Sequence, residues 1–130
     1  MLDTHTLVWW VTGDSQLSTA AGAAIAKEQQ DAGQILVSAI TPWEIAMLVQ
    51  KGRMALAMDL DEWLTAVEGL DALQMVPISS RVAVQSVQLP GNFHRDPADR
   101  LIVALAREVN APLITADEKI HAYPHVRWLW

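Results

Sequence analysis

Four acidic residues that lie far apart in the sequence have the types and positions that metal chemistry needs. They are Asp3, Glu44, Asp99 and Asp117, and each stands where the chain is expected to leave a strand or enter a helix. In an open α/β sheet such positions meet at the carboxyl edge of the strands. Carboxylates crowded into one pocket repel each other, and a bound divalent cation normally offsets that cost. The pattern therefore predicts a metal site and suggests hydrolysis.

Each acid also has an ordinary structural explanation. Asp and Glu favour the first turn of a helix, where they cap free N–H groups and complement the helix dipole. Glu44 fits a capping box with Thr41, Glu118 fits one with Thr115, and Asp96 suits an N-cap. Taken singly, each acid is explained better by capping than by chemistry.

The helical spacing favours chemistry over capping for Asp99. Ile102 and Ala106 share its helix face and belong to an apolar stripe. A carboxylate on a buried stripe is desolvated unless something binds it. Glu44 leads into a similar stripe, and Asp3 directly follows a strand that we expect to be buried. Four such coincidences at one sheet edge indicate a shared site.

The elements that position these acids are expected to alternate between strand and helix. Apolar runs predict a short strand ahead of Asp3 and further strands at 35–40, 75–78, 112–114 and 126–130. Caps and periodicity predict helices at 4–11, 18–30, 41–52, 59–70, 80–89 and 96–110, with a short helix starting at 115–118. This alternation predicts a single three-layer α/β domain over residues 1–130.

Composition narrows the class of protein. The chain has no cysteine, which excludes disulfides and thiolate metal sites and fits a reducing compartment. No apolar run approaches the roughly 20 residues that a membrane span needs, and the first residues do not resemble a signal peptide. We therefore expect a soluble, cytoplasmic protein without a membrane partner.

Charge and hydrophobicity bear on the partners. The net charge of -6 argues against a general nucleic-acid coat protein but is compatible with a nuclease whose acids bind metal. Hydrophobic residues make up 52% of the chain against 18% charged, with six tryptophans. A buried partner surface is therefore expected.

Other catalytic patterns find less support. None of the four histidines forms the HxxxH or HExxH spacing of a zinc site, although His94 lies in the loop that leads to Asp99. No Gly-rich phosphate-binding loop is present. The run from Asp3 to Thr6 is similar to the DxDxT motif of haloacid-dehalogenase-type phosphatases, but His5 replaces the acid that such a scheme needs.

Four stretches, in this order, resemble the PIN-domain family and specifically the VapC-like toxins of bacterial toxin–antitoxin pairs. They are LDTHTLVWW at 2–10, SAITPWEI at 38–45, HRDPADRLIVALA at 94–106 and LITADEKI at 113–120. The likeness covers nearly the whole chain. There are two departures: only two residues precede Asp3, and Ala98 stands where relatives often carry an aromatic residue.

The resemblance implies a three-layer α/β/α PIN-like fold with a central, mostly parallel sheet. It places the family's acidic quartet on Asp3, Glu44, Asp99 and Asp117, with Asp96 as a further nearby acid. It also implies Mg²⁺- or Mn²⁺-dependent cleavage of RNA, a homodimer, and inhibition by a cognate antitoxin protein.

Neighbouring polar residues have expected supporting roles, which are hydrogen bonds to the carboxylates and contacts to the RNA backbone. Thr4 and Thr115 are placed to hydrogen-bond the carboxylates or a water. Arg95, Arg100 and Lys119 flank the acids and are candidates for the RNA contacts, with solvated surface charge an equal alternative for Lys119.

Two other functions stay open on the residues alone. One is a non-catalytic PIN-like module that binds RNA or protein, against which an intact acid quartet argues. The other is a metal-dependent DNA nuclease, which the same chemistry supports equally well.

Overall fold

Strand pairing puts the segment before Asp3 at the centre of a parallel sheet. The computed structural model describes residues 1–130, and in it Leu2 pairs with Val37 on one side and with Ile114 on the other. Strand β1 (Ile35–Ser38) pairs with β2 (Leu73–Val76), and β3 (Leu113–Ile114) pairs with β4 (Trp128–Leu129). The spatial order is therefore β2, β1, the first residues, β3 and β4, with every pairing parallel.

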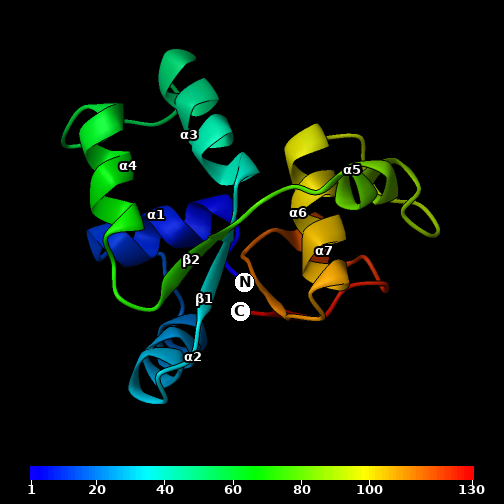
Figure 1. Ribbon diagram of the computed structural model, residues 1–130, viewed down its shortest axis with the longest axis horizontal. Coiled ribbons are helices and arrows are strands. Elements are labelled where there is room, and N and C mark those ends of the chain that lie inside the picture. Colours follow the sequence, from blue (N-terminus) through cyan, green and yellow to red (C-terminus); the bar gives the residue numbers. More distant parts are fainter.

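Helices connect these strands (Figure 1). They are α1 (Thr4–Thr12), α2 (Thr19–Gln30), α3 (Ile40–Gln50), α4 (Leu60–Glu68), α5 (Ser80–Val87), α6 (Pro97–Glu108) and α7 (Glu118–His121). Because parallel strands need crossover connections, at least one helix lies between each strand and the next along the chain.

Two hydrophobic cores lie on opposite faces of the sheet because side chains alternate along each strand. Met1 and Leu113 enter one core, which α5, α6 and α7 help to build. Leu2 and Ile114 enter the other core, to which α1, α2, α3 and α4 contribute. Figure 1 shows α1, α3 and α4 grouped on one side and α5, α6 and α7 on the other. The predicted three-layer α/β/α fold is confirmed.

Two predicted capping boxes do not form. Helix α3 begins at Ile40, whose N–H donates to Ser38 Oγ at 3.3 Å, so Thr41 is buried inside the helix instead of capping it. Glu44 is therefore free of a capping role. Thr115 does not cap α7 either, because Asp117 is the N-cap and accepts from the Lys119 N–H at 2.8 Å.

Other caps agree with the sequence. Ser18, Asp59, Ser79 and Asp96 each accept a backbone N–H at the start of a helix. Strands β1 and β2 end earlier than predicted, at Ser38 and Val76, since the next residues already turn towards α3 and α5. No helix combines the length and the apolar character needed to cross a membrane.

Candidate active site

The sheet topology explains why Asp3 lies at the centre of the site. Its neighbours β1 and β3 continue the sheet in opposite directions, and this reversal of strand order is where α/β folds open a crevice at the carboxyl ends. Asp3 follows the central segment directly and is the N-cap of α1. Ser38 and Thr115 come at the ends of the two flanking strands.

All four predicted acids line one pocket, which we call the acid pocket. Asp3 comes from the strand end, Glu44 from α3, Asp99 from the first turn of α6 and Asp117 from the N-cap of α7. The convergence expected from their positions in the sequence is present. For Glu44 the structure also removes the capping explanation, which leaves a side chain directed to this pocket.

Two threonines hold the Asp3 and Glu44 carboxylates in place. Asp3 is 7% exposed, and its Oδ2 accepts from Thr115 Oγ1 at 2.7 Å while its Oδ1 accepts from the Thr4 N–H at 2.7 Å. Thr4 Oγ1 donates to Glu44 Oε2 at 2.5 Å. The hydrogen bonds expected from Thr4 and Thr115 are therefore present.

Burial and mutual repulsion make the negative charge costly. Burial raises the pKa of Asp3 and of Glu44 above their usual values, and neighbouring carboxylates add to both shifts. For Asp99, burial first and then the charges of Asp3, Asp96, Glu44 and Asp117 raise the pKa to about 8. The hydrogen bonds from Thr4 and Thr115 offset only part of this cost.

His94 adds a nitrogen to the cluster. One ligand atom each from His94, Asp99 and Asp117 lie within 4.8 Å of one another. His94 Nε2 is 3.1 Å from Asp99 Oδ2, yet it is buried and makes no hydrogen bond. The position of His94 in the loop before α6 predicted that it lies near the site, and it does.

This donor set fits a divalent cation. Several carboxylate oxygens, desolvated and repelling one another, are the ligands that Mg²⁺ and Mn²⁺ prefer, and Mn²⁺ also accepts an imidazole nitrogen. His94, Asp99 and Asp117 offer ligand atoms close enough to share one ion, and Asp3 and Glu44 line the same pocket.

The basic residues named from the sequence take different positions. Arg100 is used inside the fold, where its guanidinium donates to the carbonyls of Ser86, Val87, Phe93 and His94. Arg95 and Lys119 are exposed. Asp96 is exposed, and its Oδ1 accepts from the Asp99 N–H at 3.1 Å as an N-cap.

Three further residues line the acid pocket that were not predicted from the sequence to do so. Arg53 is the only arginine or lysine that lines the acid pocket, and His5 and Trp9 line it from α1. For Arg53 no pattern pointed to the site, because it lies beyond the end of α3. For His5 and Trp9 the spacing of four residues on one helix was the available sign.

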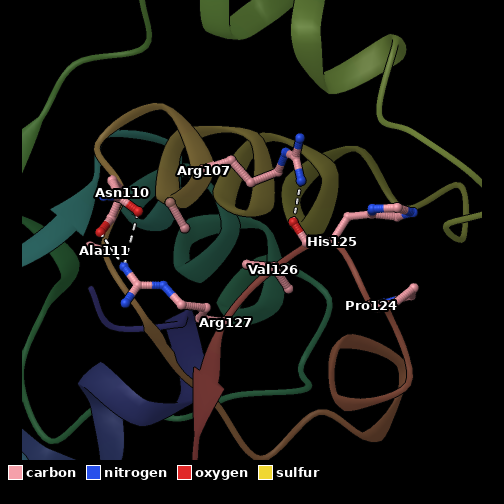
Figure 2. Close-up of a pocket in the computed structure, with 8 residues that line it drawn as sticks. Arg107, Asn110, Ala111, Pro124, His125, Val126 and Arg127 are labelled. Carbon is pink, nitrogen blue, oxygen red and sulfur yellow. Dashed lines mark hydrogen bonds between the residues drawn. The ribbon is translucent and has the colours of Figure 1, made fainter.

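A second pocket lies at the opposite, amino edge of the sheet, just before β3 and β4 (Figure 2). Its two arginines are already engaged, since Arg107 donates to the His125 carbonyl and Arg127 to the carbonyl and side chain of Asn110. No carboxylate lines it. It therefore lacks the carboxylate ligands that Mg²⁺ or Mn²⁺ would need, which the acid pocket supplies.

Comparison with known proteins agrees with this geometry. The family model described as PIN domain matches residues 1–126. The chain belongs to the PIN-domain family. This PIN domain is 36% identical over 127 residues to Ribonuclease VapC22 of Mycobacterium tuberculosis, and the match covers 98% of this chain and 93% of that protein.

Two solved structures share the fold. One is VapBC2 from Rickettsia felis bound to a DNA fragment from its promoter, with a TM-score of 0.70, 18% identity, and coverage of 99% of this chain and 96% of that one. The other is a toxin–antitoxin complex from Klebsiella pneumoniae, with a TM-score of 0.61, 20% identity, and coverage of 99% and 94%. Sequence identities this low show that the fold is shared and show nothing more.

The raised pKa of Asp99 predicts how stability depends on pH when divalent metal is removed. Between the ordinary value of 3.8 and the folded value of about 8, the folded state holds a proton that the unfolded state has lost. Asp99 therefore contributes stability below pH 4 that is lost as the pH rises through 8. Urea unfolding in chelator should show the free energy of unfolding falling over this range.

Two variants test this assignment. Asp99→Asn should flatten the fall, whereas Asp61→Asn, at an exposed position on α4, should leave it unchanged. A profile for Asp99→Asn as steep as that of the wild type would show that Asp99 is not the strained group.

Proposed function

We propose that this PIN domain is a metal-dependent endoribonuclease that acts as the toxin of a toxin–antitoxin pair. The observation that carries the proposal is the convergence of four carboxylates from four separate segments in the acid pocket. Similarity to a protein named as a ribonuclease favours RNA over DNA, a choice that the carboxylates alone do not make.

The roles of the chain's own residues follow from their contacts. When bound, Mg²⁺ or Mn²⁺ would supply activation of a water and stabilisation of the charge that grows on the phosphate oxygens. The carboxylates of Asp3, Glu44, Asp99 and Asp117 would bind this ion and orient it. Thr115 and Thr4 fix Asp3 and Glu44 by direct hydrogen bonds, so these oxygens are held before substrate arrives.

Basic side chains are the candidates for direct contacts to the RNA backbone. Arg53 lines the acid pocket and is placed to contact a phosphate, and exposed Arg95 and Lys119 are weaker candidates for the same role. Arg100 is not included, because its donors serve backbone carbonyls.

The biological setting is part of the same proposal. The two solved relatives are described as VapBC2 and as a toxin–antitoxin complex, which supports a cognate antitoxin as partner of this chain. We place the protein in the cytoplasm, where its RNA substrate and its antitoxin would be available.

The main test compares two aspartates of α6. Asp99→Asn keeps the shape of the side chain but removes a charged oxygen ligand, so RNA cleavage with Mg²⁺ or Mn²⁺ should fall by orders of magnitude. Asp96→Asn should change it far less, because Asn caps a helix about as well as Asp. Cleavage of a labelled RNA is followed with and without chelator, with circular dichroism as the folding control.

Two outcomes would reject the metal-dependent mechanism. They are an Asp99→Asn variant that cleaves RNA as fast as the wild type, and full activity of the wild type in chelator. Equal loss in the two variants would place Asp96 among the metal ligands. Faster cleavage of a matching single-stranded DNA would favour the DNA nuclease, and binding of RNA without any cleavage would favour the non-catalytic module.

We also propose that the protein forms a homodimer through exposed apolar side chains. Trp63 is buried, but Trp43 and Trp128 are 50% and 44% exposed, and Val84 and Val87 on α5 are 55% and 77% exposed. Sedimentation at micromolar concentration should give a dimer, and the double variant Val84→Asp, Val87→Asp tests whether α5 contributes. A wild-type monomer would contradict the dimer.

A further inference from the structure

One wall of the acid pocket is aromatic and has no part in the chemistry proposed above. His5 and Trp9 are four residues apart on α1, so they lie on the same helix face, and both line the pocket. The buried face of α1 is formed by other residues, among them Leu7 and Val8. The acids and this aromatic face therefore share one cavity.

Core packing does not account for Trp9. The neighbouring Trp10 and Val11 pack against the core on this side of the sheet, but Trp9 is not among the side chains that do so. Its contacts are aromatic instead. The ring centroids of Trp9 and His5 are 5.8 Å apart, and those of Trp9 and Trp130 are 5.6 Å apart.

These contacts hold the indole without covering it. Trp130 packs against the core and supports Trp9, while His5 is exposed at the pocket. Trp9 is half-buried. A ring that is fixed by its neighbours and accessible from a polar cavity loses little conformational entropy when a flat ligand stacks on it.

The rest of the pocket suits a nucleotide next to this ring. The carboxylates would hold the metal ion that binds a phosphate, and Arg53 lies in the same cavity as a cationic contact. Single-stranded nucleic acids are bound by this combination of a charged path for the backbone and an aromatic surface for the bases.

We propose that Trp9 and His5 form a stacking surface for an unpaired nucleobase beside the scissile phosphate. This inference rests on the proposed function and adds the element of the substrate that the pocket recognises. A base inside a duplex has no free face, so the surface selects single-stranded RNA or loops. Stacking tolerates every base, so this contact selects for unpaired structure more than for sequence.

The test measures binding of intact RNA. All variants are made in the Asp99→Asn background with Mn²⁺, and affinity is measured for a single-stranded oligonucleotide that the wild type cleaves. Trp9→Leu should weaken binding about 5- to 100-fold, and Trp9→Phe, which keeps an aromatic face, by only a few-fold. Leu70→Ala, at an exposed apolar side chain outside the pocket, is the control and should bind normally.

The RNA carries the second half of the test. Removing one nucleobase beside the cleaved bond should weaken binding to the Trp9 protein as much as Trp9→Leu does, and the two losses should not add. A fully paired RNA should be insensitive to Trp9→Leu. His5→Ala, at an exposed position, should weaken RNA binding several-fold. This variant replaces Trp9→Leu in the test if Trp9→Leu does not fold.

The outcomes separate this inference from the proposed function. Unchanged binding by folded Trp9→Leu, or losses that add with base removal, would overturn the stacking surface while leaving RNA cleavage intact. If the Trp9→Leu variant does not fold, unchanged RNA binding by His5→Ala would overturn the stacking surface. A wild type that neither binds nor cleaves RNA would overturn both.

Discussion

The desolvation of carboxylates at the centre of the sheet, increased by their mutual repulsion, is the constraint on which the rest of this structure depends. Asp3 is almost completely buried, and burial together with neighbouring charge raises the pKa of Asp99 to about 8. The fold relieves part of the cost with hydrogen bonds from Thr4 and Thr115 and with the N-terminus of α1, where Asp3 is the cap. The remainder is what a divalent cation would offset.

The second face of the sheet holds the other half of the site in place. Asp99 is on α6, whose apolar stripe is buried in the core beneath it. Arg100, the next residue, ties α6 to α5 and to the loop that carries His94 through four carbonyl contacts. A half-buried cation whose donors are satisfied by backbone oxygens fixes loop geometry more firmly than a surface ion pair would. Arg100 therefore fixes the positions of His94 and Asp99.

Much of this arrangement could be predicted from the sequence. Apolar runs predicted the strands, and N-caps such as Ser18 and Asp96 predicted helix starts, because both depend on local chemistry. The position of each acid at an element boundary was sufficient to predict that the four would converge. The capping boxes at Thr41 and Thr115 were wrong, since Ser38 and Asp117 compete for the same helix ends.

Other features depend on tertiary contacts that no local pattern encodes. The use of Arg100 by backbone carbonyls follows from how α5 and the loop pack on α6. The entry of Arg53 into the acid pocket depends on the path of the chain after α3. Glu44 fitted two explanations in the sequence, and only the actual start of α3 separates them.

Calorimetric titration with Mn²⁺ tests the central claim most directly. The experiment is run at pH 7 in two buffers of different ionisation enthalpy, so that the number of protons released on binding is obtained. Because the pKa of Asp99 is about 8 in the free protein, ion binding should displace about one proton, and Asp99→Asn should abolish most of that release. Tight binding with no proton release, or no binding at all, would contradict a strained carboxylate cluster that a metal ion relieves.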